Sequence, residues 1–202
     1  MRVLLVVPTF HYADAYPTFL SFSDFPTGFG YLASALKEAG HEVFGCNPNN
    51  IIGYPNAYMM LQDTLSKKIA EVKPDLIGLG GLCTDYHFLK DAIGIIRQVT
   101  KTPIVLGGQI VTNDAEGVMK ILQPDYGIAG EGEWAITQLA AHLEEGSDGF
   151  LGKGDVSFDQ VQREIDSIPF PDYEPFGIKD MIDNYSDFTR LLYRYSRLHP
   201  RP

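Results

Sequence analysis

Apolar residues recur along this chain in short continuous runs, separated by longer stretches with helical spacing. The first run, Val3–Val7, contains only valine and leucine and stops at Pro8. An uninterrupted run of this kind is typical of a strand buried on both faces of a parallel sheet. Four later runs predict further strands: His41–Cys46, Asp75–Gly80, Pro103–Leu106 and Tyr126–Ala129.

The stretches between these runs predict helices. In the first stretch, apolar side chains recur from Tyr31 to Ala39 at helical intervals, and Gly40 stands where a glycine often ends a helix. We expect this helix to begin at Thr27. Four further helices are expected: Tyr58–Val72, Tyr86–Val99, Ala115–Leu122 and Glu133–Glu144.

The alternation of strands and helices predicts an α/β fold. Right-handed crossovers place helices on both faces of a parallel sheet. Within this class we expect a Rossmann-like or flavodoxin-like, five-stranded sheet in the order 2-1-3-4-5. The domain should span residues 1–147. Residues 148–202 contain several turn-forming glycines and prolines, and we expect a linker or extension there and not a sixth repeat.

Composition narrows the function classes. At 202 residues and 45% hydrophobic content, the chain can form one well-buried domain. A net charge of −10 argues against nucleic acid as a direct partner, since that requires clustered lysine and arginine. Cys46 and Cys83 form no CxxC pair, which favours a reducing cytoplasm. The first apolar run is too short for a signal peptide or membrane span, so we expect no membrane partner.

Glycines gather where three predicted strands end. Gly78-Leu79-Gly80-Gly81 closes the third strand, Gly107-Gly108 closes the fourth, and Gly130-Glu131-Gly132-Glu133 follows the fifth. Ligands of parallel α/β sheets bind beyond the carboxyl ends of the strands. Because glycine has no Cβ, a flat ligand could lie against the main chain there. The alternative also stays open: the glycines form tight turns, and Glu133 complements a helix dipole.

Two connecting segments carry further candidates. The hydroxyl of Thr84 could bind a ligand or, like Asp85, cap the next helix. The segment from Thr9 to Thr27 is long and aromatic for a strand–helix connection, so we expect it to cover an apolar ligand face or a partner domain. His11 has no second ligand at metal-binding spacing, so no metal site is expected.

Several common catalytic motifs are missing from the sequence. There is no GxxxxGK[ST] motif, and GxGxxG is absent from the first strand–helix turn. Nor does a serine or cysteine nucleophile stand with a credible base. The sequence therefore gives no support for a phosphate-binding loop or for covalent catalysis.

A series of short segments follows one another in a recognisable order. They are Pro26-Thr27-Gly28, Tyr31-Leu32-Ala33-Ser34-Ala35-Leu36, Ala39-Gly40-His41-Glu42-Val43, Lys73-Pro74-Asp75-Leu76-Ile77-Gly78, Gly107-Gly108, Gly130-Glu131-Gly132-Glu133 and Ile168-Pro169-Phe170-Pro171-Asp172. The series resembles the cobalamin-binding N-terminal domain of cobalamin-dependent radical S-adenosylmethionine (SAM) enzymes. The resemblance runs from Met1 to about Tyr173.

This resemblance implies cobalamin as the cofactor. The corrin ring would lie across the carboxyl edge of the sheet, approached by the loop after Pro8. The nucleotide tail would enter the cleft beside the third and fourth strands, lined by Thr84, Gly107 and Gly108. The full set of expected cofactor-binding residues is Thr9, Phe10, His11, Thr27, Gly28, Gly80, Gly81, Leu82, Cys83, Thr84, Gly107, Gly108, Gln109, Gly130, Glu131 and Gly132.

The resemblance also bears on the cobalt ligand. Methionine-synthase-like domains carry DxHxxG after the first strand, and nothing between Pro8 and Gly30 matches it. Asp85-Tyr86-His87 follows the wrong strand and lacks the glycine. We therefore expect cobalamin with its own base displaced (base-off) and no histidine on cobalt.

In the family it resembles, the catalytic half binds a 4Fe-4S cluster through CxxxCxxC and leaves one iron open for SAM. This chain contains no such motif. We expect the cluster and SAM to belong to a radical SAM domain in cis that this chain lacks. Alone the chain should not be catalytic, and the intact enzyme would be of the methyltransferase type.

Two alternatives stay open. One is a cofactor-free, flavodoxin-like docking or signalling module, in which the glycines are turns and the aromatic segment is a partner surface. The other is a small flavin- or nucleotide-sugar-binding domain.

Overall fold

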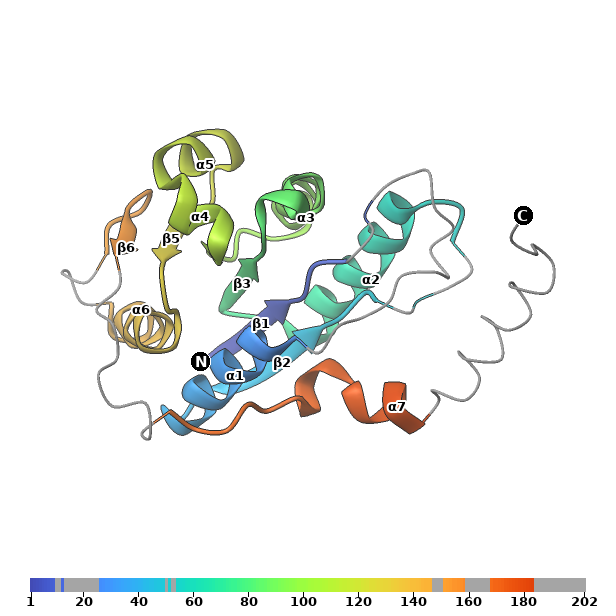
Figure 1. Cartoon of the computed structure of the whole chain (residues 1–202), viewed down its shortest axis with the longest axis horizontal. Helices are drawn as coiled ribbons and strands as arrows, with labels where there is room; N and C mark the ends of the chain where they lie inside the picture. The colour runs from blue at the N-terminus through green and yellow to red at the C-terminus, as the bar shows by residue number, and fades with distance from the viewer. Residues whose placement is uncertain are drawn as a thin grey trace, which may run out of the picture.

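The computed structural model describes residues 1–9, 12, 26–49, 51, 54–146, 151–158 and 168–183. They form a parallel sheet with helices on both faces (Figure 1). The strands are β1 (Arg2–Val6), β2 (Glu42–Cys46), β3 (Leu76–Gly80), β4 (Ile104–Gly107), β5 (Tyr126–Ala129) and β6 (Val156–Phe158). The helices are α1 (Thr27–Glu38), α2 (Ala57–Val72), α3 (Tyr86–Val99), α4 (Gln109–Asn113), α5 (Ala115–Leu122), α6 (Glu133–Glu145) and α7 (Ile178–Asp183), with 3-10 turns η2 (Cys83–Asp85) and η4 (Glu174–Phe176).

The sheet has the order β2-β1-β3-β4-β5-β6, and each neighbouring pair is parallel. The predicted fold class and the order of the first five strands are confirmed. The expected strand number is wrong by one, because β6 forms inside the stretch expected to be a linker. Backbone hydrogen bonds fix β6: Gly127 N donates to Asp155 O (3.0 Å) and Gly154 N donates to Asp125 O (2.7 Å). Three residues are too few to show a strand period in sequence.

All five predicted helices are present as α1, α2, α3, α5 and α6, with bounds close to those expected. The short helix α4 was not predicted. It follows directly on Gly108, whose carbonyl accepts hydrogen bonds from the N–H groups of Val111 and Thr112 (both 3.1 Å). A five-residue helix is barely more than one turn, so it leaves no apolar periodicity to detect.

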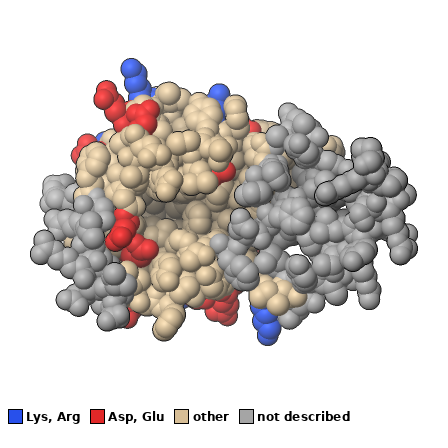
Figure 2. All heavy atoms as spheres, in the orientation of Figure 1, with Lys and Arg blue, Asp and Glu red and all other residues tan. Residues whose placement is uncertain are grey.

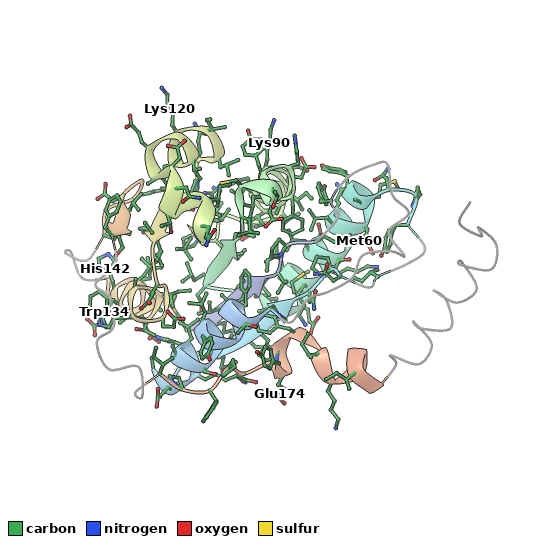
Figure 3. The ribbon with its side chains drawn as sticks, in the orientation of Figure 1. Met60, Lys90, Lys120, Trp134, His142 and Glu174 are labelled. Carbon is green, nitrogen blue, oxygen red and sulfur yellow. The ribbon has the colours of Figure 1, made fainter. Side chains whose placement is uncertain are left out.

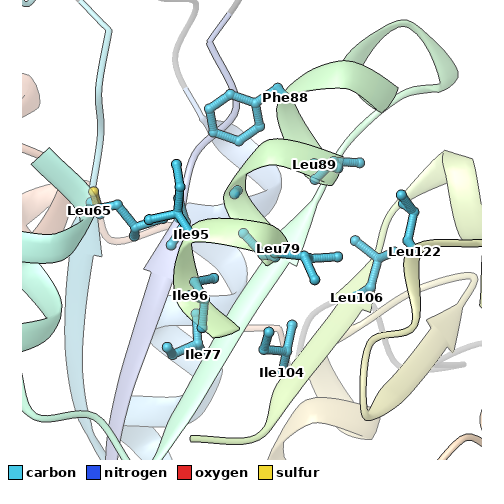
Figure 4. Packing of buried hydrophobic residues seen from close by; sticks show 14 of the residues in the cluster. Leu65, Ile77, Leu79, Phe88, Leu89, Ile95, Ile96, Ile104, Leu106 and Leu122 are labelled. Atoms are coloured by element: carbon cyan, nitrogen blue, oxygen red, sulfur yellow. The ribbon is translucent and has the colours of Figure 1, made fainter. Parts of the chain in front are cut away.

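Alternate side chains of each strand enter two separate cores. Leu4 and Val6 of β1 face the core formed with α2, α3 and α5, which Figure 4 shows from close by. Val3 and Leu5 face the opposite core, to which α1 and α6 contribute. Burial on both faces explains why β1 is apolar throughout. The candidate site lies on the α1–α6 side of the sheet.

Asp125 ties the start of β5 to its neighbours at the edge of the sheet opposite the strands' carboxyl ends. Its side chain is only 3% exposed. One carboxylate oxygen accepts hydrogen bonds from Arg97 Nη2 (2.6 Å) and Ile104 N (2.8 Å), and the other contacts Lys153 Nζ at 2.6 Å. Burial by itself raises the pKa of Asp125, but hydrogen bonds from Lys153, Arg97 and Ile104 outweigh it and hold the pKa below its ordinary value.

The segment from 168 to 178 packs back on the sheet domain. Phe176 and Ile178 are buried in the α1–α6 core, at 4% and 3% exposure. Asp172 N donates to Gly30 O (3.0 Å), and the Asp172 carboxylate pairs with Lys37 Nζ at 2.6 Å. This part of the predicted extension is therefore docked against α1 and β2. The division of the chain at residue 147 stays a prediction.

The loop after β1 lies largely outside the described residues. Its one described aromatic residue is Tyr12, which donates a hydrogen bond to Asp91 Oδ2 (2.7 Å) and packs edge-on against Phe88, with 5.4 Å between ring centroids. Within the described part of the chain, every helix is too short or too polar to cross a bilayer.

Candidate functional site

A strip of missing side chains runs along the α1–α6 face of the sheet towards the carboxyl ends of its strands. In β3, Ile77 and Leu79 enter the opposite core, so Gly78 and Gly80 occupy the positions that face α1 and α6. In β4, Gly107 likewise follows Val105 on this face. Apolar side chains would fill these positions in an ordinary core. Their absence leaves space between the sheet and the two helices.

That space is a cavity of about 250 Å³ (Figure 2 shows the hollowed face). Its lining has three chemical parts. Apolar side chains supply the walls: Leu5, Phe29, Leu32, Leu79, Val105, Ile128 and Ile136. Glycines supply the floor and rim: Gly28, Gly78, Gly80, Gly81, Gly107, Gly108, Gly130 and Gly132. Among the described residues, the charged ones that line it are Glu131 and Glu133.

The glycines differ in how much room they leave. A Cβ at Gly107 would lie 3.5 Å from Ile128 O, and one at Gly80 would lie 3.4 Å from Gly107 O, both ordinary contact distances. A Cβ at Gly28 would meet nothing within 4 Å. At these three positions the main chain tolerates a side chain. Substitution there would change the shape of the cavity and leave the surrounding strands and helices in place.

Gly108 is different. Its φ is +84°, and a Cβ there would lie 2.8 Å from both N and O of Gly81. Only glycine adopts this conformation without strain. A bulky residue at Gly108 would therefore disturb the fold as well as the cavity, because it would push the β3 and β4 loops apart.

The structure brings half of the predicted site together. The predicted residues that line the cavity are Gly28, Gly80, Gly81, Gly107, Gly108, Gly130, Glu131 and Gly132. The described residues predicted for the site that do not line it are Thr9, Thr27, Leu82, Cys83, Thr84 and Gln109. Phe10 and His11 lie outside the described residues. A role for these eight towards the exposed part of a ligand stays a prediction.

Thr84, expected to line the nucleotide tail, is exposed in η2 and does not reach the cavity. Asp85 occupies the N-cap position of α3 but makes no side-chain cap hydrogen bond to that helix; its carboxylate instead accepts a hydrogen bond from Leu82 N (2.8 Å) and closes the η2 turn. Thr9 is 3% exposed, and its Oγ1 has no hydrogen-bond partner within the described part of the chain. A buried hydroxyl of this kind is costly unless something satisfies it.

Sequence reasoning missed the apolar walls. Leu5 of β1, Phe29 of α1 and Ile136 of α6 looked like ordinary core residues, and each does contact the core. The sequence did contain a usable signal. Side chains alternate between the two faces of a strand, and this alternation places Leu5, Gly78 and Val105 on the sheet face that carries the cavity. Trp134 in the first turn of α6 is 45% exposed and points away from the helix (Figure 3).

Among the described residues that line the cavity there is no lysine, arginine or histidine. Among the described residues, no group of histidine, cysteine and carboxylate side chains could hold a metal ion. Burial raises the pKa of the Cys46 thiol to about 12, which keeps it protonated, whereas Cys83 is exposed. The site therefore offers an apolar slot, exposed main chain and two carboxylates.

Comparison with known families gives one match, to a model described as B12 binding domain, over residues 24–140. Two solved structures of TsrM, a radical SAM methyltransferase from Kitasatospora setae, resemble the chain. The structure with a tryptophan substrate and a SAM analogue bound is 25% identical (TM-score 0.57) and covers 73% of this chain. The one with cobalamin and a [4Fe-4S] cluster bound is 24% identical (TM-score 0.57), again over 73%.

The matched region makes up 26% and 27% of the two TsrM chains, so the chain spans about a quarter of their length. No protein with a curated function matches this sequence significantly.

Proposed function

We propose, from the premise that this chain belongs to the B12-binding domain family, that its glycine-rimmed cavity receives the nucleotide tail of cobalamin. The corrin ring would lie outside, on the carboxyl edge of the sheet. The observation that carries this proposal is the strip of missing side chains at Gly78, Gly80 and Gly107.

The size and lining of the cavity fit this group. About 250 Å³ is less than the volume of pockets that enclose whole drug-sized ligands. It is far too small for a corrin ring but suits a flat heteroaromatic base. The walls contributed by Leu5, Val105, Ile128 and Ile136 are apolar, as burial of an aromatic base requires. The flanking glycines let the rest of the tail approach the main chain.

The charge pattern favours cobalamin over the alternative cofactors. A flavin mononucleotide or a nucleotide sugar carries a phosphate monoester or a diphosphate, which such sites usually meet with lysine, arginine or a phosphate-binding loop. Here the charged lining residues are both glutamates. Cobalamin has a single phosphodiester, offset by the cationic cobalt centre.

We further propose that cobalamin is bound base-off without a histidine on cobalt. The lack of a DxHxxG segment in the sequence supports this. When bound, cobalamin supplies a cobalt centre that can carry a methyl group. The role of this chain is to hold and orient it. The likeness to TsrM supports a radical SAM domain in cis, with SAM and a 4Fe-4S cluster, in a methyltransferase.

Retention of cobalamin after desalting tests the proposal. The purified chain is mixed with hydroxocobalamin and passed over a gel-filtration column. We expect corrin absorbance to co-elute with the protein at close to one per chain. After reduction to Co(II), the electron paramagnetic resonance spectrum should lack nitrogen superhyperfine splitting. A chain that elutes free of corrin contradicts cobalamin binding, and nitrogen splitting contradicts only the base-off, histidine-free state.

A further inference from the structure

Residues 168–178, here called the docked segment, run along α1 (Figure 1). Ser34 Oγ donates a hydrogen bond to Phe170 O (2.5 Å), and Asp172 N donates one to Gly30 O (3.0 Å). The α1 residues that the docked segment contacts through hydrogen bonds or ion pairs are, in chain order, Thr27, Gly30, Ser34 and Lys37. Residues at intervals of three and four share one face of a helix. The docked segment therefore holds α1 along one face.

The neighbouring face of α1 lines the cavity. Gly28, Phe29 and Leu32 of this helix are among the lining residues. Phe29 connects the two faces: its ring centroid lies 6.2 Å from that of Phe176, and a Cβ at Gly80 would lie 3.6 Å from Phe29 Cζ. Phe176 is only 4% exposed and is not one of the residues that line the cavity. A displacement of Phe176 would therefore move a wall of the cavity that Phe176 does not itself form.

Two further glycines leave room for the docked segment. A Cβ at Gly30 would lie 2.9 Å from Pro171 Cβ, and one at Gly45 of β2 would lie 2.6 Å from Phe176 Cδ1. Neither glycine has a positive φ, so the backbone conformation does not require glycine at either position. Glycine inside a helix costs stability relative to alanine, and close packing accounts for its presence at Gly30. The surfaces of α1 and β2 are thus shaped to receive this segment.

The start of α1 has little local support. Its N-cap residue is Pro26, whose side chain cannot accept a hydrogen bond, and its first turn contains no acidic residue. Helix ends without such support fray readily. The position of Gly28 and Phe29, which lie in this first turn, therefore depends on what packs against α1.

We propose that the docked segment is a positioning element of the cavity: through Phe176 it fixes Phe29 in the arrangement that receives the nucleotide tail. This inference rests on the proposed cobalamin function and adds to it a coupling between the cavity and the chain that follows the sheet. Coupling between two sites is reciprocal. Docking of the segment raises the affinity for the tail, and the bound tail in turn stabilises the docked segment.

The first test separates this coupling from a general loss of stability. Dissociation constants for hydroxocobalamin and for cobinamide, which lacks the tail base, are measured by absorbance titration for the parent chain, Phe176→Leu and Ser34→Ala. The ratio of the two constants isolates the tail, because both corrinoids contain the corrin ring. Phe88→Leu is the matched control, since it makes the same substitution at a fully buried phenylalanine in the opposite core. Circular dichroism checks that every variant is folded.

In the parent, cobinamide should bind more weakly than hydroxocobalamin. Phe176→Leu should lower the ratio of the two constants at least about fivefold, the lower end of typical coupling between sites. Ser34→Ala should lower it in the same direction, and Phe88→Leu should leave it unchanged. A ratio that stays at the parent value in both docked-segment variants would overturn the coupling while tail recognition stands. If the parent binds both corrinoids equally or binds neither, the proposed function itself fails.

Hydrogen exchange of the parent chain tests the reverse direction without any variant. Peptides from the docked segment contain the amide of Asp172, which is bonded to Gly30 O. They should exchange at least about fivefold more slowly with saturating hydroxocobalamin than with saturating cobinamide. Peptides from α2, none of whose residues line the cavity, should exchange alike with both corrinoids. Equal exchange of the docked segment in the two complexes would contradict the coupling and leave cobalamin binding untouched.

Discussion

Substitution of Gly107 by valine should weaken cobalamin binding and spare the fold. A Cβ at Gly107 would meet Ile128 O at 3.5 Å and Ile128 Cβ at 3.9 Å, and Gly107 is not among the residues with positive φ. The strand end can therefore carry a side chain without strain. The added methyl groups would take up space in a cavity of only about 250 Å³.

The expected loss of affinity for cobalamin can be estimated from the free-energy cost of overpacking. Extra methyl groups forced into a well-packed site cost about 1–3 kcal/mol. If the cavity is filled by the tail in the complex, this cost falls on binding, and the dissociation constant for hydroxocobalamin should rise roughly five- to 150-fold. Gly107→Ala should have a smaller effect in the same direction.

Titration with hydroxocobalamin, followed by absorbance, gives the affinity, and urea unfolding of the free chain gives the stability. Gly94→Ala is the matched control. Gly94 lies exposed in α3, and a Cβ there would meet nothing within 4 Å. Alanine in this helix should raise the free energy of unfolding by about 0.5–1 kcal/mol and leave affinity unchanged. If Gly107→Val binds as tightly as the parent, the cavity does not hold part of cobalamin.

Three other predictions concern the scaffold. Asp125→Ala should lower the free energy of unfolding in urea by about 1–3 kcal/mol, because the amide of Ile104 loses its acceptor. The pKa of Asp125 is lowered on folding. The contribution of this carboxylate to the free energy of unfolding is therefore complete above the unfolded pKa of about 3.9, and it disappears as the pH falls through the folded pKa. The alanine variant should accordingly lack this part of the loss of stability when the pH is lowered. Phe176→Ala should cost about 3–5 kcal/mol in the same urea assay if the 168–178 segment belongs to the domain, and an unchanged midpoint would show that it does not. Iodoacetamide should alkylate Cys83 well before Cys46 when adducts are mapped by mass spectrometry, and equal rates would contradict the burial of Cys46.

The sequence predicted the frame of the fold because that frame depends on local patterns. β1 and β3 are buried on both faces, so their uninterrupted apolar runs stand out. β6 was not predicted because it has only three residues and is held by backbone hydrogen bonds. Such bonds can form with any residue type except proline as donor, so they leave no pattern in the sequence. The packing of Phe176 in the α1–α6 core could not be predicted from the sequence either, since the residues that it contacts lie far away along the chain.

The candidate site was half predictable for a related reason. Glycines at strand ends marked the rim correctly, because the carboxyl ends of parallel strands share one edge. Thr84 lies outside the cavity because η2 turns it to the surface, which depends on the conformation of a single turn, and its predicted contact with the tail stays a prediction. The strain at Gly108 depends on its φ and on the approach of Gly81, neither of which can be read from composition.

Comparison of cobalamin with cobinamide tests most directly whether the cavity recognises the nucleotide tail. Cobinamide has the corrin ring and its amides but lacks the tail base. Titrated against the same chain, cobinamide should bind roughly ten- to 150-fold more weakly, since burial of an aromatic group contributes roughly 1.5–3 kcal/mol. Equal affinity for the two corrinoids would contradict recognition of the tail and leave the glycine-rimmed cavity without a role in binding.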